Sequence, residues 1–72
     1  MVRVKETGSN SVRQRRRVAE LTQADLAKAA GVSRQTIISI EGGDYAPSVF
    51  LALRLAHAMD TTVEELFDLD QR

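Results

Sequence analysis

The chain is poor in several residue types that stabilise or anchor other proteins. Its 72 residues include no cysteine, no tryptophan, one proline and only 4% aromatic residues. The lack of cysteine excludes disulfides, thiolate zinc sites and thiol catalysis. No apolar run approaches the roughly 18 residues that a membrane-spanning helix needs, and the N-terminus has no apolar stretch of signal-peptide length. We therefore expect a cytoplasmic protein that does not interact with membranes.

Length and hydrophobic content limit the fold to one small domain. A chain of 72 residues buries a modest core, worth about 3–5 kcal/mol net. The hydrophobic fraction of 43% is ordinary for a globular protein, which argues against disorder throughout.

A net charge of zero conceals a strong asymmetry along the chain. Residues 1–36 contain eight basic and three acidic residues, whereas residues 37–72 contain two basic and seven acidic residues. A polyanion is therefore attracted to the first half and repelled by the second. A solvated arginine-rich helix that balances an acidic tail explains the same asymmetry, so charge alone does not identify the partner.

Five short helices are expected between residues 10 and 69, after a flexible polar arm over residues 1–9 and before a tail over residues 70–72. Glycine, proline and capping residues divide the segments, and no segment shows convincing strand alternation. The expected helices cover about residues 10–20, 22–31, 33–42 and 48–59, with a short fifth helix opening at Thr61 or Thr62. Short connections between short helices predict a compact all-α five-helix bundle.

The most informative segment runs from residue 23 to residue 42. Two helices joined by so few residues cross at a steep angle, and the crossing requires a small side chain such as Ala27. Gly31 permits the positive φ of a sharp turn. Ile37 and Ile40 then anchor the second helix of this pair on the first. The pattern predicts a helix-turn-helix.

The same anchoring turns a polar face of the helix over residues 33–42 towards solvent. That face carries Arg34, Gln35, Thr36 and Ser39, together with Ile38. Arginine pairs with guanine and glutamine with adenine in the major groove. An ordinary helical hairpin is the simpler interpretation, but the spacing of the small residue, the glycine and the two isoleucines favours a DNA-reading unit.

The stretch LTQADLAKAAGVSRQTIISIEGGDYAPS closely resembles the Xre family of helix-turn-helix regulators, which includes the lambda-type phage repressors and Cro proteins. The similarity extends from about residue 10 to residue 67. It implies a five-helix DNA-binding domain of the lambda-repressor type, usually dimeric, with no catalytic activity and no cofactor.

The resemblance also implies roles for individual residues. Gln23 is expected to bond a phosphate and to brace the recognition helix, which covers about residues 33–42. Arg16 is expected to form a partly buried ion pair with Glu41. The predicted DNA-binding residues are Arg16, Gln23, Ser33, Arg34, Gln35, Thr36, Ser39 and Tyr45.

The loop after the recognition helix departs from the family pattern. It reads GGDY where a basic or amide residue is usual, and Asp44 beside a phosphate would be repelled. The backbone amides of Gly42 or Gly43, or the hydroxyl of Tyr45, remain available for a phosphate oxygen. Asp60 replaces a usual glycine and tolerates left-handed geometry better than most residues.

The helix over residues 48–59 carries more apolar residues than one core-facing stripe requires. Phe50 and Leu53 lie outside that stripe, with His57 one turn further on. Val63 and Leu66 match dimer contacts of phage repressors. These five residues are the predicted homodimer interface, and a two-fold dimer predicts a palindromic operator. The alternative is that Phe50 folds over the Tyr45–Pro47 loop and only thickens the core.

Other functions receive less support from the sequence. The single histidine, His57, has no metal-ligand partner at a useful spacing, and Glu64 and Glu65 diverge by about 100° on a helix. We expect no metal site, no small-molecule ligand and no enzyme. The competing hypothesis is a protein-interaction module, such as an antitoxin that binds a toxin or an adaptor that contacts polymerase.

Overall fold

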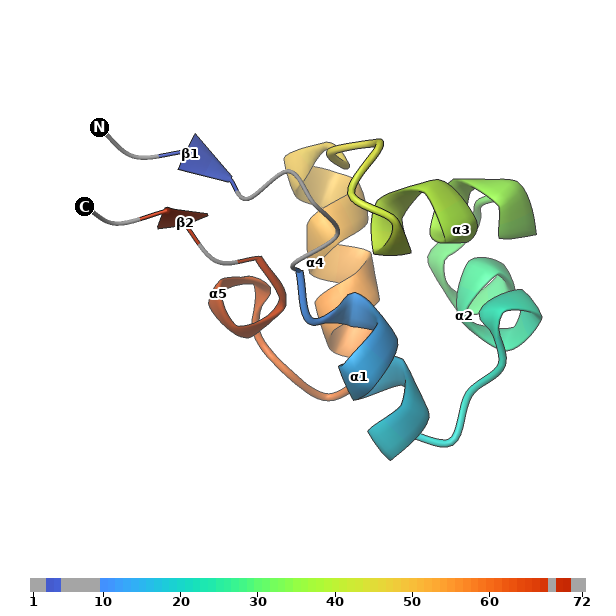
Figure 1. The fold of residues 1–72 in the computed structure, drawn as a ribbon. Helices are drawn as coiled ribbons and strands as arrows, with labels where there is room; N and C mark the ends of the chain where they lie inside the picture. The colour runs from blue at the N-terminus through green and yellow to red at the C-terminus, as the bar shows by residue number, and fades with distance from the viewer. Residues whose placement is uncertain (1–2, 5–9, 68, 71–72) are drawn as a thin grey trace.

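The computed structural model describes residues 3–4, 10–67 and 69–70, and residues 10–67 form an all-α bundle (Figure 1). The helices are α1 (Val12–Val18), α2 (Gln23–Ala30), α3 (Arg34–Glu41), α4 (Val49–Ala58) and α5 (Val63–Leu66). The predicted five-helix architecture is confirmed. Most of the predicted arm, residues 1–2 and 5–9, and residues 71–72 of the predicted tail lie outside the described residues.

Side-chain caps fix where α2 to α5 begin. Thr22 Oγ1 accepts a hydrogen bond from Asp25 N at 2.9 Å, and Asp25 Oδ2 accepts one from Thr22 N at 3.0 Å, which forms the predicted capping box. Ser33 and Ser48 cap α3 and α4. Thr62, rather than Thr61, caps α5 by accepting from Glu65 N at 3.2 Å.

Left-handed residues separate several of the helices. Gly31 at φ +75° ends α2, and Gly43 at φ +81° follows α3. Asp60 takes φ +56°, in agreement with the expected left-handed geometry. Glu20 also has a positive φ, of +60°, after α1 has ended at Val18, two residues earlier than the sequence predicted.

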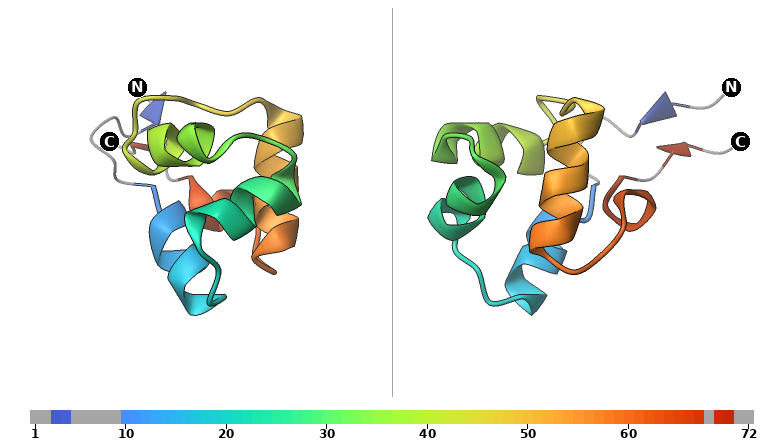
Figure 2. Two further views of the ribbon diagram at one scale, coloured as in Figure 1. Left: turned by 90° about the vertical axis from the view of Figure 1, so that its right-hand side faces the viewer. Right: turned by 180° about the vertical axis from the view of Figure 1, so that it is seen from behind.

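The core lies where α4 contacts the other helices. Figure 2 shows α4 between the α2–α3 pair on one side and α5 on the other. The buried hydrophobic side chains are Val12, Leu26, Ala27, Ala30, Ile37, Ile40, Leu51, Ala52, Leu55, Ala56, Met59 and Leu66. Ile37 and Ile40 of α3 are fully buried, so the orientation of α3 is fixed by its inner face.

A short strand pair adds a feature that the sequence did not predict. Strand β1 (Arg3–Val4) pairs antiparallel with β2 (Leu69–Asp70), with Arg3 opposite Asp70 and Val4 opposite Leu69. Two-residue strands show no alternation that a pattern could reveal. Within the described part of the chain, no helix is long and apolar enough to cross a membrane.

Candidate nucleic-acid interface

The helices α2 and α3 form the predicted helix-turn-helix. Figure 2 (left) shows the two helices crossing on one side of the molecule. Ala27 is buried, and its carbonyl accepts a hydrogen bond from Val32 N at 3.0 Å, which closes the turn after Gly31. The small side chain at the crossing and the left-handed glycine therefore serve the purposes expected from the sequence.

The outer face of α3 presents polar groups from its first two turns. Arg34 and Gln35 are exposed, whereas Thr36, Ile38 and Ser39 are half-buried. The hydroxyls of Ser33 and Thr36 lie 3.0 Å apart and bond each other. Arg34 and Gln35 thus have the greatest reach from this face.

A hollow of about 290 Å³ lies between this face and the loop that follows α3. Its walls are Ser33, Gln35, Thr36, Ser39, Asp44 and Tyr45. Tyr45 is about half exposed, so its hydroxyl is accessible beside the recognition helix. The hollow brings together five of the predicted DNA-binding residues and adds Asp44.

A partly buried polar network joins α1, α2 and the end of α3. Arg16 Nε donates to Glu41 Oε2 at 2.6 Å, and Gln23 Nε2 donates to Glu41 Oε1 at 3.2 Å. Arg16 Nη1 also donates to the carbonyl of Leu21 at 2.9 Å. The Arg16 and Glu41 side chains are only 12% and 6% exposed. The predicted ion pair is confirmed, and Gln23 braces α3 as expected.

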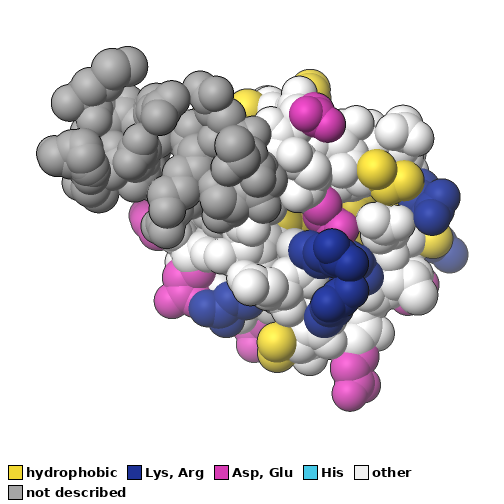
Figure 3. All heavy atoms as spheres, viewed as in Figure 1, with side chains coloured by type: hydrophobic (Ala, Val, Ile, Leu, Met, Phe, Trp, Pro, Cys, Tyr) yellow, Lys and Arg dark blue, Asp and Glu magenta, His cyan; other side chains and the backbone are white. Residues whose placement is uncertain are grey.

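This geometry does not support the prediction that Arg16 itself contacts DNA. Its guanidinium is turned inward and occupied by Glu41 and Leu21. Arg13 is exposed, and it lines a hollow of about 460 Å³ together with Arg16, Gln23 and Glu41. The run of arginines at residues 13–17 indicated a basic helix surface, but the sequence did not resolve which of these arginines faces outward. Figure 3 shows basic side chains gathered over α1.

Two further hydrogen bonds hold the helix-turn-helix in place. Asn10 Nδ2 donates to the carbonyl of Ile40 at 2.7 Å, while Asn10 Oδ1 accepts from Val12 N at 3.2 Å. Asn10 therefore binds the first amide of α1 and ties that helix to the end of α3. Arg54 Nε donates to the carbonyl of Ala30 at 3.1 Å and so links α4 to the end of α2. Sequence reasoning missed both of these long-range links.

The predicted dimer residues divide into exposed and buried ones. Phe50 is 73% exposed, and Leu53 and His57 are also exposed on α4, whereas Val63 is half-buried. Leu66 is fully buried in the core, so its prediction as an interface residue is wrong. Its side chain packs inside the domain's own hydrophobic core.

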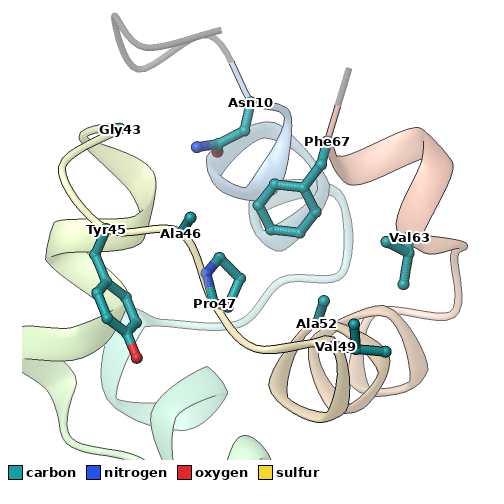
Figure 4. Close-up of a pocket in the computed structure, with 9 residues that line it drawn as sticks. All are labelled: Asn10, Gly43, Tyr45, Ala46, Pro47, Val49, Ala52, Val63 and Phe67. Carbon is teal, nitrogen blue, oxygen red and sulfur yellow. The ribbon is translucent and has the colours of Figure 1, made fainter. Parts of the chain in front are cut away.

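The alternative in which Phe50 covers the loop is also wrong. A cavity of about 230 Å³ lies beside that loop. Figure 4 shows Pro47, Val63 and Phe67 among the residues around it. Phe50 is absent from its lining and remains free on the surface of α4. Among the described residues, no group of three histidine, aspartate or glutamate side chains is placed to hold a metal ion.

A helix-turn-helix family model matches residues 12–66. An uncharacterized HTH-type transcriptional regulator of Methanothermobacter thermautotrophicus is 46% identical over 61 residues, which cover 83% of this chain and 88% of that protein. A similarly described protein of Methanocaldococcus jannaschii is 48% identical over 58 residues, covering 81% and 88%.

Solved structures share the fold. The restriction-modification controller protein C.AhdI of Aeromonas hydrophila superposes with a TM-score of 0.75 at 32% identity, covering 86% of this chain and 92% of that one. The P22 c2 repressor in complex with a synthetic operator gives a TM-score of 0.74 at 28% identity, covering 83% and 89%. The chain therefore belongs to the Xre-type helix-turn-helix family of DNA-binding transcriptional regulators.

Proposed function

We propose that this regulator reads a specific operator by placing α3 in the major groove of double-stranded DNA. The observation that carries this proposal is the bracing of α3, which is held by Asn10, by the Arg16–Glu41–Gln23 network and by its buried isoleucines. A rigid helix with a polar outer face is what base readout requires. Arg34 and Gln35 contact base edges, and Thr36 and Ser39 complete the reading face.

Phosphate contacts come from the rim of this surface. Gln23 Nε2 carries two N–H groups, and its bond to Glu41 leaves one of them for a phosphate oxygen. Gln23 and the exposed Arg13 line the hollow beside α1. Ser33 and Tyr45 line the other hollow, which lies between the reading face and the loop after α3. Such contacts fix the position of the protein on the duplex without selecting sequence.

The protein acts as a homodimer through α4. Phe50, Leu53 and His57 are exposed on one helix, and the half-buried Val63 borders the hollow that contains Leu53 and His57. Removing an exposed phenylalanine or leucine from water contributes about 1.5–3 kcal/mol each, which supports association of two copies. A two-fold dimer places its recognition helices about 34 Å apart and selects a palindromic operator.

Replacement of Arg34 tests base reading. Selection of randomised duplexes by the purified protein first gives the preferred site. Arg34→Ala then costs about 1–3 kcal/mol of binding free energy on that site and broadens selection at one base pair. Arg34→Lys is the matched control, because it keeps the charge but loses the planar two-pronged donor. Equal losses on specific and random duplexes with Arg34→Ala contradict base reading.

The remaining features of the proposed assignment follow from this role. The protein is a non-enzymatic regulator without a cofactor and acts in the cytoplasm, where its DNA target lies. Residues 10–69 form the DNA-binding domain, between an N-terminal arm over residues 1–9 and a tail over residues 70–72.

A protein-interaction function is the second candidate, and the exposed apolar face of α4 favours it. Val49 and Phe50 are each 73% exposed, and a toxin or polymerase subunit can cover them as well as a second copy can. Salt dependence separates the two functions. Affinity for DNA that falls steeply with salt supports groove binding, whereas an interaction-only module shows little DNA affinity.

A further inference from the structure

The loop after α3 holds an exposed carboxylate beside the end of that helix. Asp44 is exposed, and a β-carbon placed on Gly42 would lie 3.4 Å from Asp44 Oδ2 and 3.4 Å from the carbonyl oxygen of Ile38. The carboxylate therefore lies near Gly42, at the C-terminal end of α3. Neither of the two ion pairs formed within the described residues includes Asp44.

The backbone holds Asp44 firmly against the recognition helix. Asp44 N donates to the carbonyl of Ser39 at 2.9 Å, and Gly43 N donates to the carbonyl of Ile40 at 3.0 Å. The left-handed Gly43 makes this closure of the helix end possible. The backbone of Asp44 is therefore fixed to the end of α3, and the carboxylate is attached to this fixed point.

Asp44 also shares a hollow with the base-reading residues. Gln35 and Ser39 line the hollow from α3, and Asp44 and Tyr45 line it from the loop. The short Ser39 side chain contributes little bulk to the α3 wall. A base edge that faces Gln35 and Ser39 is therefore close to the Asp44 carboxylate.

We propose that Asp44 is a specificity-determining residue that accepts a hydrogen bond from the N4 amino group of a cytosine, an inference that rests on the proposed insertion of α3 in the major groove. A carboxylate can only accept hydrogen bonds. Guanine and thymine present acceptors in the major groove, and adenine pairs its amino group with the acceptor N7. Cytosine presents a donor with no adjacent acceptor on the same base, so it is the base that Asp44 favours.

The test is selection of randomised duplexes by the wild-type protein and by Asp44→Asn and Asp44→Ala, followed by binding measurements on the selected site. The wild type enriches cytosine at one position of each half-site and discriminates against guanine and thymine there about tenfold. Asp44→Asn can donate as well as accept, so it binds the guanine and thymine sites about as well as the cytosine site. Asp60→Asn, the same change of side chain at an exposed position between α4 and α5, keeps the wild-type preference.

The contrary results separate this proposal from the proposed function. If the wild type and Asp44→Asn select identical sites, Asp44 reads no base, although sequence-specific binding stands. If Asp44→Asn gains equally on every sequence, the carboxylate only repels phosphate and the proposal fails. If the wild type enriches no sequence, both the reading by α3 and the role of Asp44 are overturned.

Discussion

Glu41 accepts hydrogen bonds from two helices at once, and its replacement by glutamine tests how much the network contributes. The side chain accepts from Arg16 Nε at 2.6 Å and from Gln23 Nε2 at 3.2 Å, and it is 6% exposed. Glu41→Gln keeps the size and one acceptor oxygen but removes the charge. Arg16 then remains a largely buried cation without a counterion.

The magnitude follows from that unpaired charge. Removal of one partner of a buried ion pair costs about 3–5 kcal/mol. Arg16 is still slightly exposed, and the glutamine keeps one acceptor oxygen, so both reduce this cost. We therefore expect the free energy of unfolding to fall by about 2–4 kcal/mol. For a domain of this size each kcal/mol lowers the melting temperature by roughly 4–8 °C. The expected decrease is therefore at least about 8 °C, a large fraction of the stability of so small a core.

The second ion pair provides the control. Arg15 and Glu65 are 41% and 52% exposed, so Glu65→Gln is expected to cost under about 1 kcal/mol. Thermal melts followed by circular dichroism compare the two variants with the wild type. If Glu41→Gln melts at the same temperature as Glu65→Gln, burial does not determine the value of these pairs and the reasoning is refuted.

Three further predictions concern the surface of α4 and the helix ends. Phe50→Glu shifts the protein towards monomer in sedimentation equilibrium, because a charge replaces an exposed apolar contact; a parent protein that is monomeric even on DNA contradicts the α4 dimer. The Thr22 backbone N–H and hydroxyl lower the pKa of Asp25 below 3.8, so its stabilising contribution is present above that pH and is lost as pH falls through the lower folded pKa. Melts of Asp25→Asn and the wild type should accordingly differ at neutral pH and converge in acid well below pH 3.8. Glu20→Gly relieves a left-handed backbone at φ +60° and is expected to raise stability by up to about 1 kcal/mol, whereas an unchanged or lower melting temperature argues against strain there.

Local sequence signals predicted the centre of the molecule well. Thr22, Gly31 and Ser33 act on backbone groups within a few residues of themselves, so their pattern alone was enough to place the ends of α2 and the start of α3. Ile37 and Ile40 recur at helical spacing, which identified the inner face of α3 and, by exclusion, its outer face.

The sequence by itself therefore determined the helix-turn-helix and the outward polar face of α3, whereas the tertiary structure decided which of several similar residues are buried, paired or exposed. Leu66 and Phe50 are both large and apolar, yet one is fully buried and the other is 73% exposed. Arg13 and Arg16 belong to one run, but only Arg16 meets Glu41, which is 25 residues away. Periodicity records the chemistry of neighbours along the chain. Burial and pairing depend on contacts between residues far apart in sequence, which exist only once the helices have packed.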